Sequence, residues 1–143
     1  MNITQISVFL ENRKGRLSDV CNLFGENDIN IRALTIAETE TFGVMRLVVD
    51  RPSAAIEVLK EHGFTANLTN VVAVEVEDTP GGLAKILNVL SKNEINIEYM
   101  YGFIEKFSDK ALMVFRFDNP EAASNVLADS EITVVSKDDI QKL

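Results

Sequence analysis

The chain has 143 residues, of which 46% are hydrophobic and 25% charged, a composition that builds an apolar core and excludes a disordered protein. Its formal net charge of −8 excludes a nucleic-acid-binding surface, because the longest basic cluster is only Arg13, Lys14 and Arg16. No apolar run reaches membrane-spanning length, no signal-peptide pattern is present, and the single Cys21 cannot form an internal disulfide, so we expect a cytoplasmic protein without a membrane partner.

The first half of the chain alternates strand and helix patterns. Ile6, Val8 and Leu10 recur at every second position, which is typical of a half-buried strand. After a turn, an apolar stripe with the spacing of one helix face is formed by Leu17, Val20, Cys21 and Phe24. The remaining elements expected in this half are strands over 29–36 and 44–49, a helix from Pro52 and a short strand over 65–68.

The second half repeats the first in the same order. Segment 77–97 matches segment 11–31 at an offset of 66 residues, and segment 118–127 matches 50–59 at an offset of 68. The residues that recur unchanged are Glu11, Gly15, Leu17, Asn22, Asn27, Ile29, Asn30 and Ile31, found again as Glu77, Gly81, Leu83, Asn88, Asn93, Ile95, Asn96 and Ile97. Two copies of so long a unit do not make a solenoid, so the repeat indicates a duplicated small domain.

Each copy gives the order β-α-β-β-α-β. With right-handed crossovers this order predicts an α+β fold made of two tandem ferredoxin-like domains, each an antiparallel sheet with both helices on one face. We place the domains at 1–69 and 70–143. A unit of about 70 residues is only marginally stable alone, so we expect the two copies to pack together through their first helices and neighbouring sheet edges.

The turn before the first helix of the second copy carries a recognisable motif. It reads Glu77-Asp78-Thr79-Pro80-Gly81-Gly82-Leu83 and is followed by a strand that begins Ile95-Asn96-Ile97. It resembles the acidic-x-Pro-Gly-x-Leu signature of ACT domains. The first copy keeps this frame as Asn12-Arg13-Lys14-Gly15-Arg16-Leu17 and Ile29-Asn30-Ile31, with Lys14 in place of the proline. The resemblance covers nearly the whole chain and implies two tandem ACT domains.

The resemblance implies a ligand site between the turn of one domain and the second-strand start of its neighbour. One site then combines Asn12, Lys14, Gly15, Arg16 and Leu17 with Asn96 and Ile97. The other combines Asp78, Pro80, Gly81, Gly82 and Leu83 with Asn30 and Ile31. The chemistry of such a turn agrees, because helix N-terminal amides attract a carboxylate and glycine lets the backbone approach a ligand. The Asp78 carboxylate and the Asn12 amide oxygen can accept hydrogen bonds from a ligand ammonium.

Ordinary structural roles compete with these assignments. Gly15 and Gly81 also suit plain turns, and Asn30 and Asn96 also suit the end of a helix and the start of a strand. The cations of the first turn also suit a solvated surface. Ligand binding and structural roles therefore both stay open at these positions.

No catalytic constellation is visible in the sequence. His62 is expected at the C-terminal end of a helix and Cys21 in an apolar stripe, which makes a poor nucleophile and base pair. Metal-ligand spacings, phosphate-binding loops and dinucleotide fingerprints are absent from the sequence. We therefore expect a protein that is not an enzyme and carries no cofactor or metal.

Together these features predict a free-standing regulatory protein that binds a small ligand, a free amino acid, between its two ACT domains. Because the chain carries no enzyme domain, it would modulate a partner enzyme of amino-acid metabolism in trans. One alternative is a small regulatory subunit of a biosynthetic enzyme such as acetolactate synthase. Another is a structural pairing module with non-functional ligand sites. We also expect a homodimer.

Overall fold

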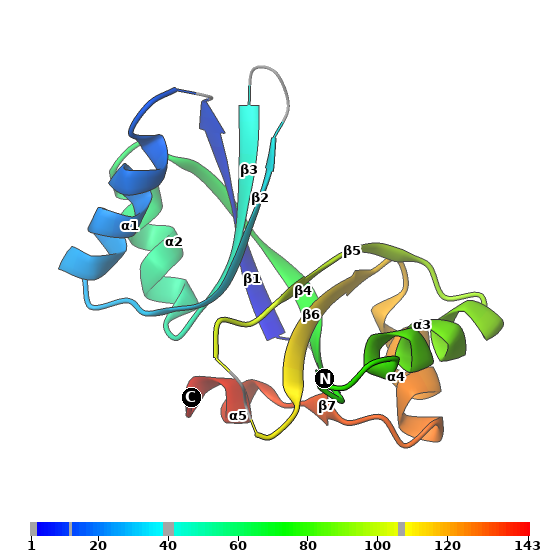
Figure 1. Ribbon diagram of the computed structural model, residues 1–143. Helices are drawn as coiled ribbons and strands as arrows, with labels where there is room; N and C mark the ends of the chain where they lie inside the picture. The colour runs from blue at the N-terminus through cyan, green and yellow to red at the C-terminus, as the bar shows by residue number, and fades with distance from the viewer. Residues whose placement is uncertain (1–2, 12, 39–41, 106–107) are drawn as a thin grey trace. The chain divides into compact units, whose positions relative to one another are not determined.

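The computed structural model describes residues 3–11, 13–38, 42–105 and 108–143. The chain divides into two compact units, one formed by Thr4–Thr69 and the other by Asn70–Leu143 together with Ile3. Each unit follows the order β-α-β-β-α-β (Figure 1). The predicted α+β fold with two ferredoxin-like repeats is therefore confirmed.

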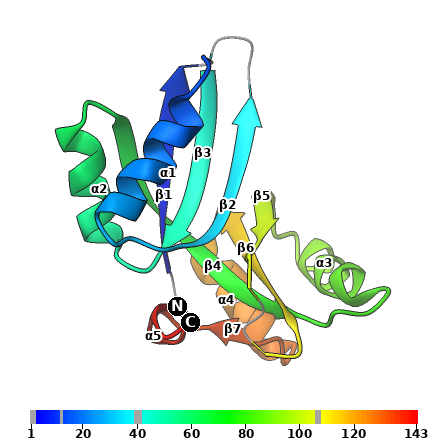
Figure 2. The same ribbon diagram turned by 60° about the vertical axis from the view of Figure 1, so that its left-hand side comes forward.

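The first unit is a sheet in the order β2-β3-β1-β4 with two helices on one face (Figures 1 and 2). Its elements are β1 (Ile3–Glu11), α1 (Arg16–Glu26), β2 (Ile31–Glu38), β3 (Phe42–Val49), α2 (Pro52–Glu61) and the beginning of β4 (Thr65–Val76). Strands β1 and β3 pair antiparallel, with Ile6 opposite Leu47 and Val8 opposite Met45. These four side chains are fully buried and form the sheet side of the core. The helices contribute Val20, Leu23, Phe24, Ala55 and Leu59.

The second unit repeats this architecture in the order β7-β4-β6-β5. It uses the rest of β4, then α3 (Gly82–Lys92), β5 (Ile97–Gly102), β6 (Ala111–Phe117), α4 (Pro120–Asp129), β7 (Val134–Val135) and α5 (Lys137–Gln141). Strands β4 and β6 pair antiparallel, with Val72 opposite Phe115 and Val74 opposite Met113. The helix side of its core is formed by Ile86, Leu90, Ala123 and Leu127.

The two repeats match down to the ends of their elements. Helices α1 and α3 both have 11 residues, and α2 and α4 both have 10. Pro52 and Pro120 open α2 and α4, where a missing N–H is harmless and the fixed φ suits a helix. In the second copy Asn119 also caps its helix, because its side chain accepts a hydrogen bond of 3.1 Å from the Ala122 N–H.

Two elements differ from the sequence prediction. The short strand expected over 65–68 is the beginning of β4, which continues to Val76 as one strand of 12 residues. The helix α5 was not expected. Its signal is present in the sequence, because Ser136 accepts a hydrogen bond of 3.2 Å from the Asp139 N–H and acidic residues fill the first turn.

The inward face of α1 also differs from the prediction. Cys21, expected as a packed apolar residue, is exposed, and Leu17 is 43% exposed. The buried face consists of Val20, Leu23 and Phe24 instead. The helix carries apolar residues on more of its circumference than the sheet can cover. The orientation that buries Leu23 is favoured because it removes more apolar area from water than one that buries Cys21.

Each long helix ends in a residue with a left-handed backbone. This residue is Gly63 after α2, with φ of 80°, and Glu131 after α4, with φ of 60°. After α1 and α3 it is Asp28 and Glu94, with φ of 57° and 56°. A left-handed residue after a helix lets the next N–H groups bond back to the last carbonyls. Side chains with a β-carbon adopt it at a cost that glycine avoids.

We therefore expect Glu94→Gly to stabilise the protein. Relief of the left-handed strain, less the entropy that glycine adds to the unfolded chain, should raise the free energy of unfolding by about 0.5–1 kcal/mol. Glu94→Ala is the matched control, since it removes the same side chain but keeps the β-carbon. Urea unfolding measures both variants, and equal effects of glycine and alanine would contradict this explanation.

Candidate functional site

Both first helices begin from the same backbone turn. Gly15 and Gly81 have φ of 90° and 85°, in the left-handed region, and each is the residue before the first helical turn. The Asp19 N–H donates to the Gly15 carbonyl and the Lys85 N–H to the Gly81 carbonyl, both at 3.0 Å. Only glycine adopts such a φ at low cost, so the recurrence of this residue has a backbone cause in both copies.

The second turn is closed more tightly than a side chain would allow. A β-carbon added at Gly82 would collide with the backbone carbonyl of Glu77. The Gly82 N–H donates to the Thr79 carbonyl at 3.0 Å, which closes the turn around Pro80 and Gly81. This pair of glycines therefore holds the chain in a compact entry into α3, with Asp78 and Pro80 exposed at its outside.

The first turn is built with charge instead. Arg13 lies 3.6 Å from the Glu11 carboxylate, and both side chains are exposed. The Arg16 guanidinium lies over the Phe64 ring, 4.4 Å from its centroid, and donates to Asp19 at 3.4 Å. Arg16 therefore belongs to the packing of its own unit, whereas the sequence suggested a purely ligand-facing or solvated cation.

Only some of the residues predicted for the first turn line a common hollow. Arg16 and Leu17 line a hollow of about 80 Å³, together with Arg13 and residues of β2 such as Ile36 and Glu38. Lys14 and Gly15 are exposed beside it. Asn12 lies outside the described residues. Of the second-turn residues, Gly82 lines a separate hollow with α3 and the α4–β7 connection, and Leu83 packs on the core.

The predicted strand-start residues lie at equivalent places in the two units. The Asn30 N–H donates to Asp50 Oδ1 at 2.9 Å, and its carbonyl accepts from the Asp50 N–H at 3.1 Å. The Asn96 carbonyl accepts from the Asp118 N–H at 3.4 Å. These bonds fix where β2 and β5 begin. The side chains of Asn30 and Asn96 are exposed, while Ile31 and Ile97 pair with β3 and β6.

Directly after these asparagines, both units contain a β-bulge. The pairing register shifts between Ile31 and Ala33 in β2, and between Ile97 and Tyr99 in β5. Bulges re-aim the side chain of the extra residue and are frequent beside binding sites. In β2 that residue is Arg32, whose Nε is buried without a hydrogen-bond partner among the described residues.

Sequence reasoning missed Arg32, although one signal was available. The repeat offset of 66 aligns Arg32 with Glu98, so the two copies place opposite charges in the same bulge. Glu98 is already paired, at 3.3 Å from the Nε of Arg116. The positive member of the pair is therefore the one that can serve an anionic ligand.

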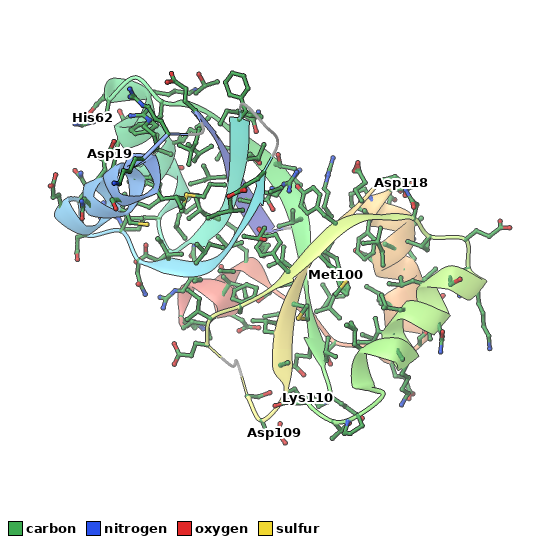
Figure 3. All side chains as sticks on the ribbon, turned by 45° about the horizontal axis from the view of Figure 1, so that its top comes forward. Asp19, His62, Met100, Asp109, Lys110 and Asp118 are labelled. Carbon is green, nitrogen blue, oxygen red and sulfur yellow. The ribbon has the colours of Figure 1, made fainter. Side chains whose placement is uncertain are left out.

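The described residues offer little other chemistry. His62 ends α2 with its Nδ1 2.9 Å from the Val58 carbonyl oxygen, and it lies beside Asp19 in a shallow hollow (Figure 3). In the described part of the chain no group of three or more His, Cys, Asp or Glu side chains is placed to hold a metal ion. Nor does any helix there combine the length and apolar character needed to cross a membrane.

Comparison with known proteins identifies the family. The family model described as an ACT domain pair matches residues 1–143, and the chain therefore belongs to the ACT domain pair family. A crystal structure of protein BT0572 from Bacteroides thetaiotaomicron is similar, with a TM-score of 0.93 and 38% identity over 100% of this chain and 98% of that one.

More distant structures share the fold. The ligand-free regulatory subunit of aspartate kinase from Thermus thermophilus matches with a TM-score of 0.62 and 21% identity, over 89% of this chain and 91% of that one. The corresponding subunit from Thermus flavus matches with a TM-score of 0.59 and 17% identity, over 92% and 94%. A search of curated proteins finds no match.

The contact of Arg16 with Phe64 gives a test of the first turn. We expect Arg16→Gln to lower the free energy of unfolding by about 0.5–1 kcal/mol, because it removes the cation over the ring. Arg13→Gln is the matched control and should change stability by less than about 0.5 kcal/mol, since its ion pair is exposed. Denaturant unfolding of Arg16→Gln, Phe64→Leu and the double variant measures the coupling, and strictly additive effects would show that the contact contributes nothing.

Proposed function

We propose that this chain is a non-catalytic regulatory protein that binds a free amino acid between its two ACT domains and modulates a partner enzyme. The observation that carries this proposal is the pair of left-handed glycine turns at Gly15 and Gly81, each opening a helix, in a chain matched over its whole length by an ACT domain pair. Such a turn presents first-turn amides and a partial positive charge to an anion.

The proposed sites are shared between the repeats, each combining one turn with the strand start of the other copy. The first comprises Asn12, Lys14, Gly15, Arg16 and Leu17 with Asn96 and Ile97, and the second comprises Asp78, Pro80, Gly81, Gly82 and Leu83 with Asn30 and Ile31. Arg13 and Arg16 are paired with Glu11 and Asp19, but the Nε of Arg16 is buried without a hydrogen-bond partner among the described residues. We therefore assign the ligand carboxylate of the first site to Lys14, Arg16 and the turn amides.

Arg32 extends the second proposed site. It follows Asn30 and Ile31 in the bulge of β2, and the buried Nε of its guanidinium lacks a hydrogen-bond partner among the described residues. A buried donor without a partner costs free energy that a ligand carboxylate would recover. Arginine also binds carboxylates with two parallel hydrogen bonds. We therefore add Arg32 to the residues that would hold the amino acid.

The output of such a protein lies in a separate chain. The aspartate kinase regulatory subunits that share the fold are named for an enzyme of amino-acid metabolism. We propose a partner enzyme of that broad class and a homodimeric assembly, with a small regulatory subunit of the acetolactate synthase kind as one form of it. A ligand would act by favouring one arrangement of the two domains over another.

Ligand binding itself is tested by thermal unfolding with each of the twenty amino acids. A ligand present at about 100 times its dissociation constant stabilises the folded state by about 2.7 kcal/mol. We expect a small subset of amino acids to raise the melting temperature. If none does, the chain is a structural pairing module with non-functional sites, and the regulatory proposal is wrong.

The turn is tested by Gly81→Asn. Asparagine tolerates the left-handed backbone better than other side chains, and the space around Gly81 is open. The fold should persist while the added side chain meets the ligand. We expect about a tenfold or greater loss of affinity at one site, measured by calorimetry.

Gly63→Asn provides the matched control for this variant. Gly63 has a similar φ of 80° and open surroundings but follows α2, outside both proposed sites. It should leave affinity and stoichiometry unchanged. If Gly81→Asn binds with the affinity and stoichiometry of the wild type, the turn does not hold the ligand, even if an amino acid binds elsewhere.

A further inference from the structure

The second unit contains a hollow of its own, which has Gly82 in common with the second shared site proposed above and no other residue of either shared site. It has a volume of about 180 Å³ and lies between the end of β4, the first turns of α3 and the connection from α4 to β7. All of its lining residues lie between Glu75 and Thr133, so the hollow is complete within one unit. A cavity of about 150 Å³ holds benzene, so this one admits a molecule of about six to nine non-hydrogen atoms.

The lining combines both signs of charge with an apolar wall. Glu75 lies near the end of β4, Glu77 directly after it, and Lys85 in α3. Lys110 lies in the segment before β6 (Figure 3). The apolar wall consists of Ile86, Val89 and Ile132. The rest of the lining consists of Gly82, Ser130, Glu131 and Thr133, so three carboxylates face two ammonium groups. A small molecule with an ammonium, a carboxylate and a short aliphatic chain matches the charged and apolar parts of this lining.

The ion pair inside the hollow is loose. Lys110 Nζ lies 3.9 Å from Glu75 Oε2, which is too long for a hydrogen bond. The Glu75 side chain is only 14% exposed, whereas that of Lys110 is 43% exposed. A mostly buried carboxylate whose cation lies 3.9 Å away gains from a ligand ammonium that comes closer. The mobile lysine stem can bring its ammonium to a ligand carboxylate.

The equivalent place in the first unit is also a hollow, of about 380 Å³, but its lining has different chemistry. It includes Phe9, Glu11, Arg16, Phe42 and Phe64. The residue opening the first helix is Arg16 there and Gly82 in the second unit. Arg16 places its guanidinium over Phe64, whose N–H donates to the Leu59 carbonyl at 3.0 Å. Ile132 takes the place of Phe64, since its N–H donates to the Leu127 carbonyl at 3.0 Å. In the first unit, a cation and aromatic rings thus line the place where the second unit has Gly82, Lys110 and Ile132.

The charge of the neighbouring helix residue is reversed between the units. Asp19, which accepts a hydrogen bond from Arg16 at 3.4 Å, aligns with Lys85. The second unit therefore replaces an internal arginine and its carboxylate with a glycine and an ammonium. Such a place suits a ligand whose own ammonium faces Glu75 and Glu77 while its carboxylate faces Lys85.

We propose that the second unit binds a free aliphatic amino acid in this hollow, at a site that has only Gly82 in common with those proposed between the domains. The ligand ammonium lies against the carboxylates of Glu75 and Glu77. Its carboxylate pairs with Lys85 and Lys110, and its side chain packs on Ile86, Val89 and Ile132. Binding at this site needs no residue of the first unit.

Nuclear magnetic resonance of the full chain, labelled at isoleucine and valine methyl groups, tests this proposal. Titration with leucine, valine, isoleucine or methionine should shift the methyl signals of Ile86, Val89 and Ile132 saturably. The shared sites would instead shift Ile31 and Ile97, so either proposal can fail alone. If none of the four amino acids moves the signals of Ile86, Val89 and Ile132 at millimolar concentration, the site does not exist.

Two variants and two ligand analogues test the chemistry. Lys85→Glu should weaken binding at this hollow by at least about tenfold, equal to about 1.4 kcal/mol. Lys92 is an exposed lysine in the last turn of the same helix, so Lys92→Glu is the matched control. It should leave unchanged the ligand concentration at the midpoint of the titration. Against leucine, 4-methylpentanoate lacks the ammonium and 3-methylbutylamine lacks the carboxylate, so each should bind at least about tenfold more weakly. Equal binding of either analogue, or an unchanged midpoint in Lys85→Glu, would overturn the proposal.

Discussion

The left-handed glycine before each first helix is the constraint from which the two units are built. A chain that leaves the end of an inner strand and enters a helix lying across the same sheet must change direction within a few residues. Gly15 and Gly81 do this with φ of 90° and 85°, and α1 and α3 then run for the same length. The position of the helix determines which side chains reach the core, and the core in turn positions the remaining strands.

On this common frame the two copies have diverged in electrostatics more than in shape. Equivalent positions carry Arg16 and Gly82, Asp19 and Lys85, Arg32 and Glu98. Each substitution lies on the helix start, its first turns or the bulge that follows the helix. The apolar positions that form the two cores vary far less in character. A duplicated domain can change what its turns attract without altering the backbone that presents them, because exposed charges contribute little to stability.

Sequence patterns predicted much of this architecture, for identifiable reasons. The strands alternate cleanly, Pro52 and Pro120 mark helix starts, and the repeat lets each half support the interpretation of the other. Periodicity was ambiguous in α1, where Cys21 and Leu23 compete for the core and only the packing of the sheet decides. Neither the continuity of β4 nor the bulge at Arg32 has a local signal, since both depend on pairing between strands. The side-chain groups that would surround a ligand were predicted as residue types at a turn, but the engagement of Arg16 by Phe64 depends on residues 48 positions apart.

The close approach of Gly82 to the Glu77 carbonyl has a consequence for how such a chain can evolve. Two similar stretches in one gene can overwrite each other by recombination, which tends to make the copies identical again. An exchange that changed Gly82 alone to the arginine of the first copy would place a side chain where even a β-carbon collides with the Glu77 carbonyl. Its product would have to open the turn in order to fold. The turn of the second repeat can therefore take on the first copy's sequence only as a whole, together with the first copy's backbone, and not residue by residue at Gly82.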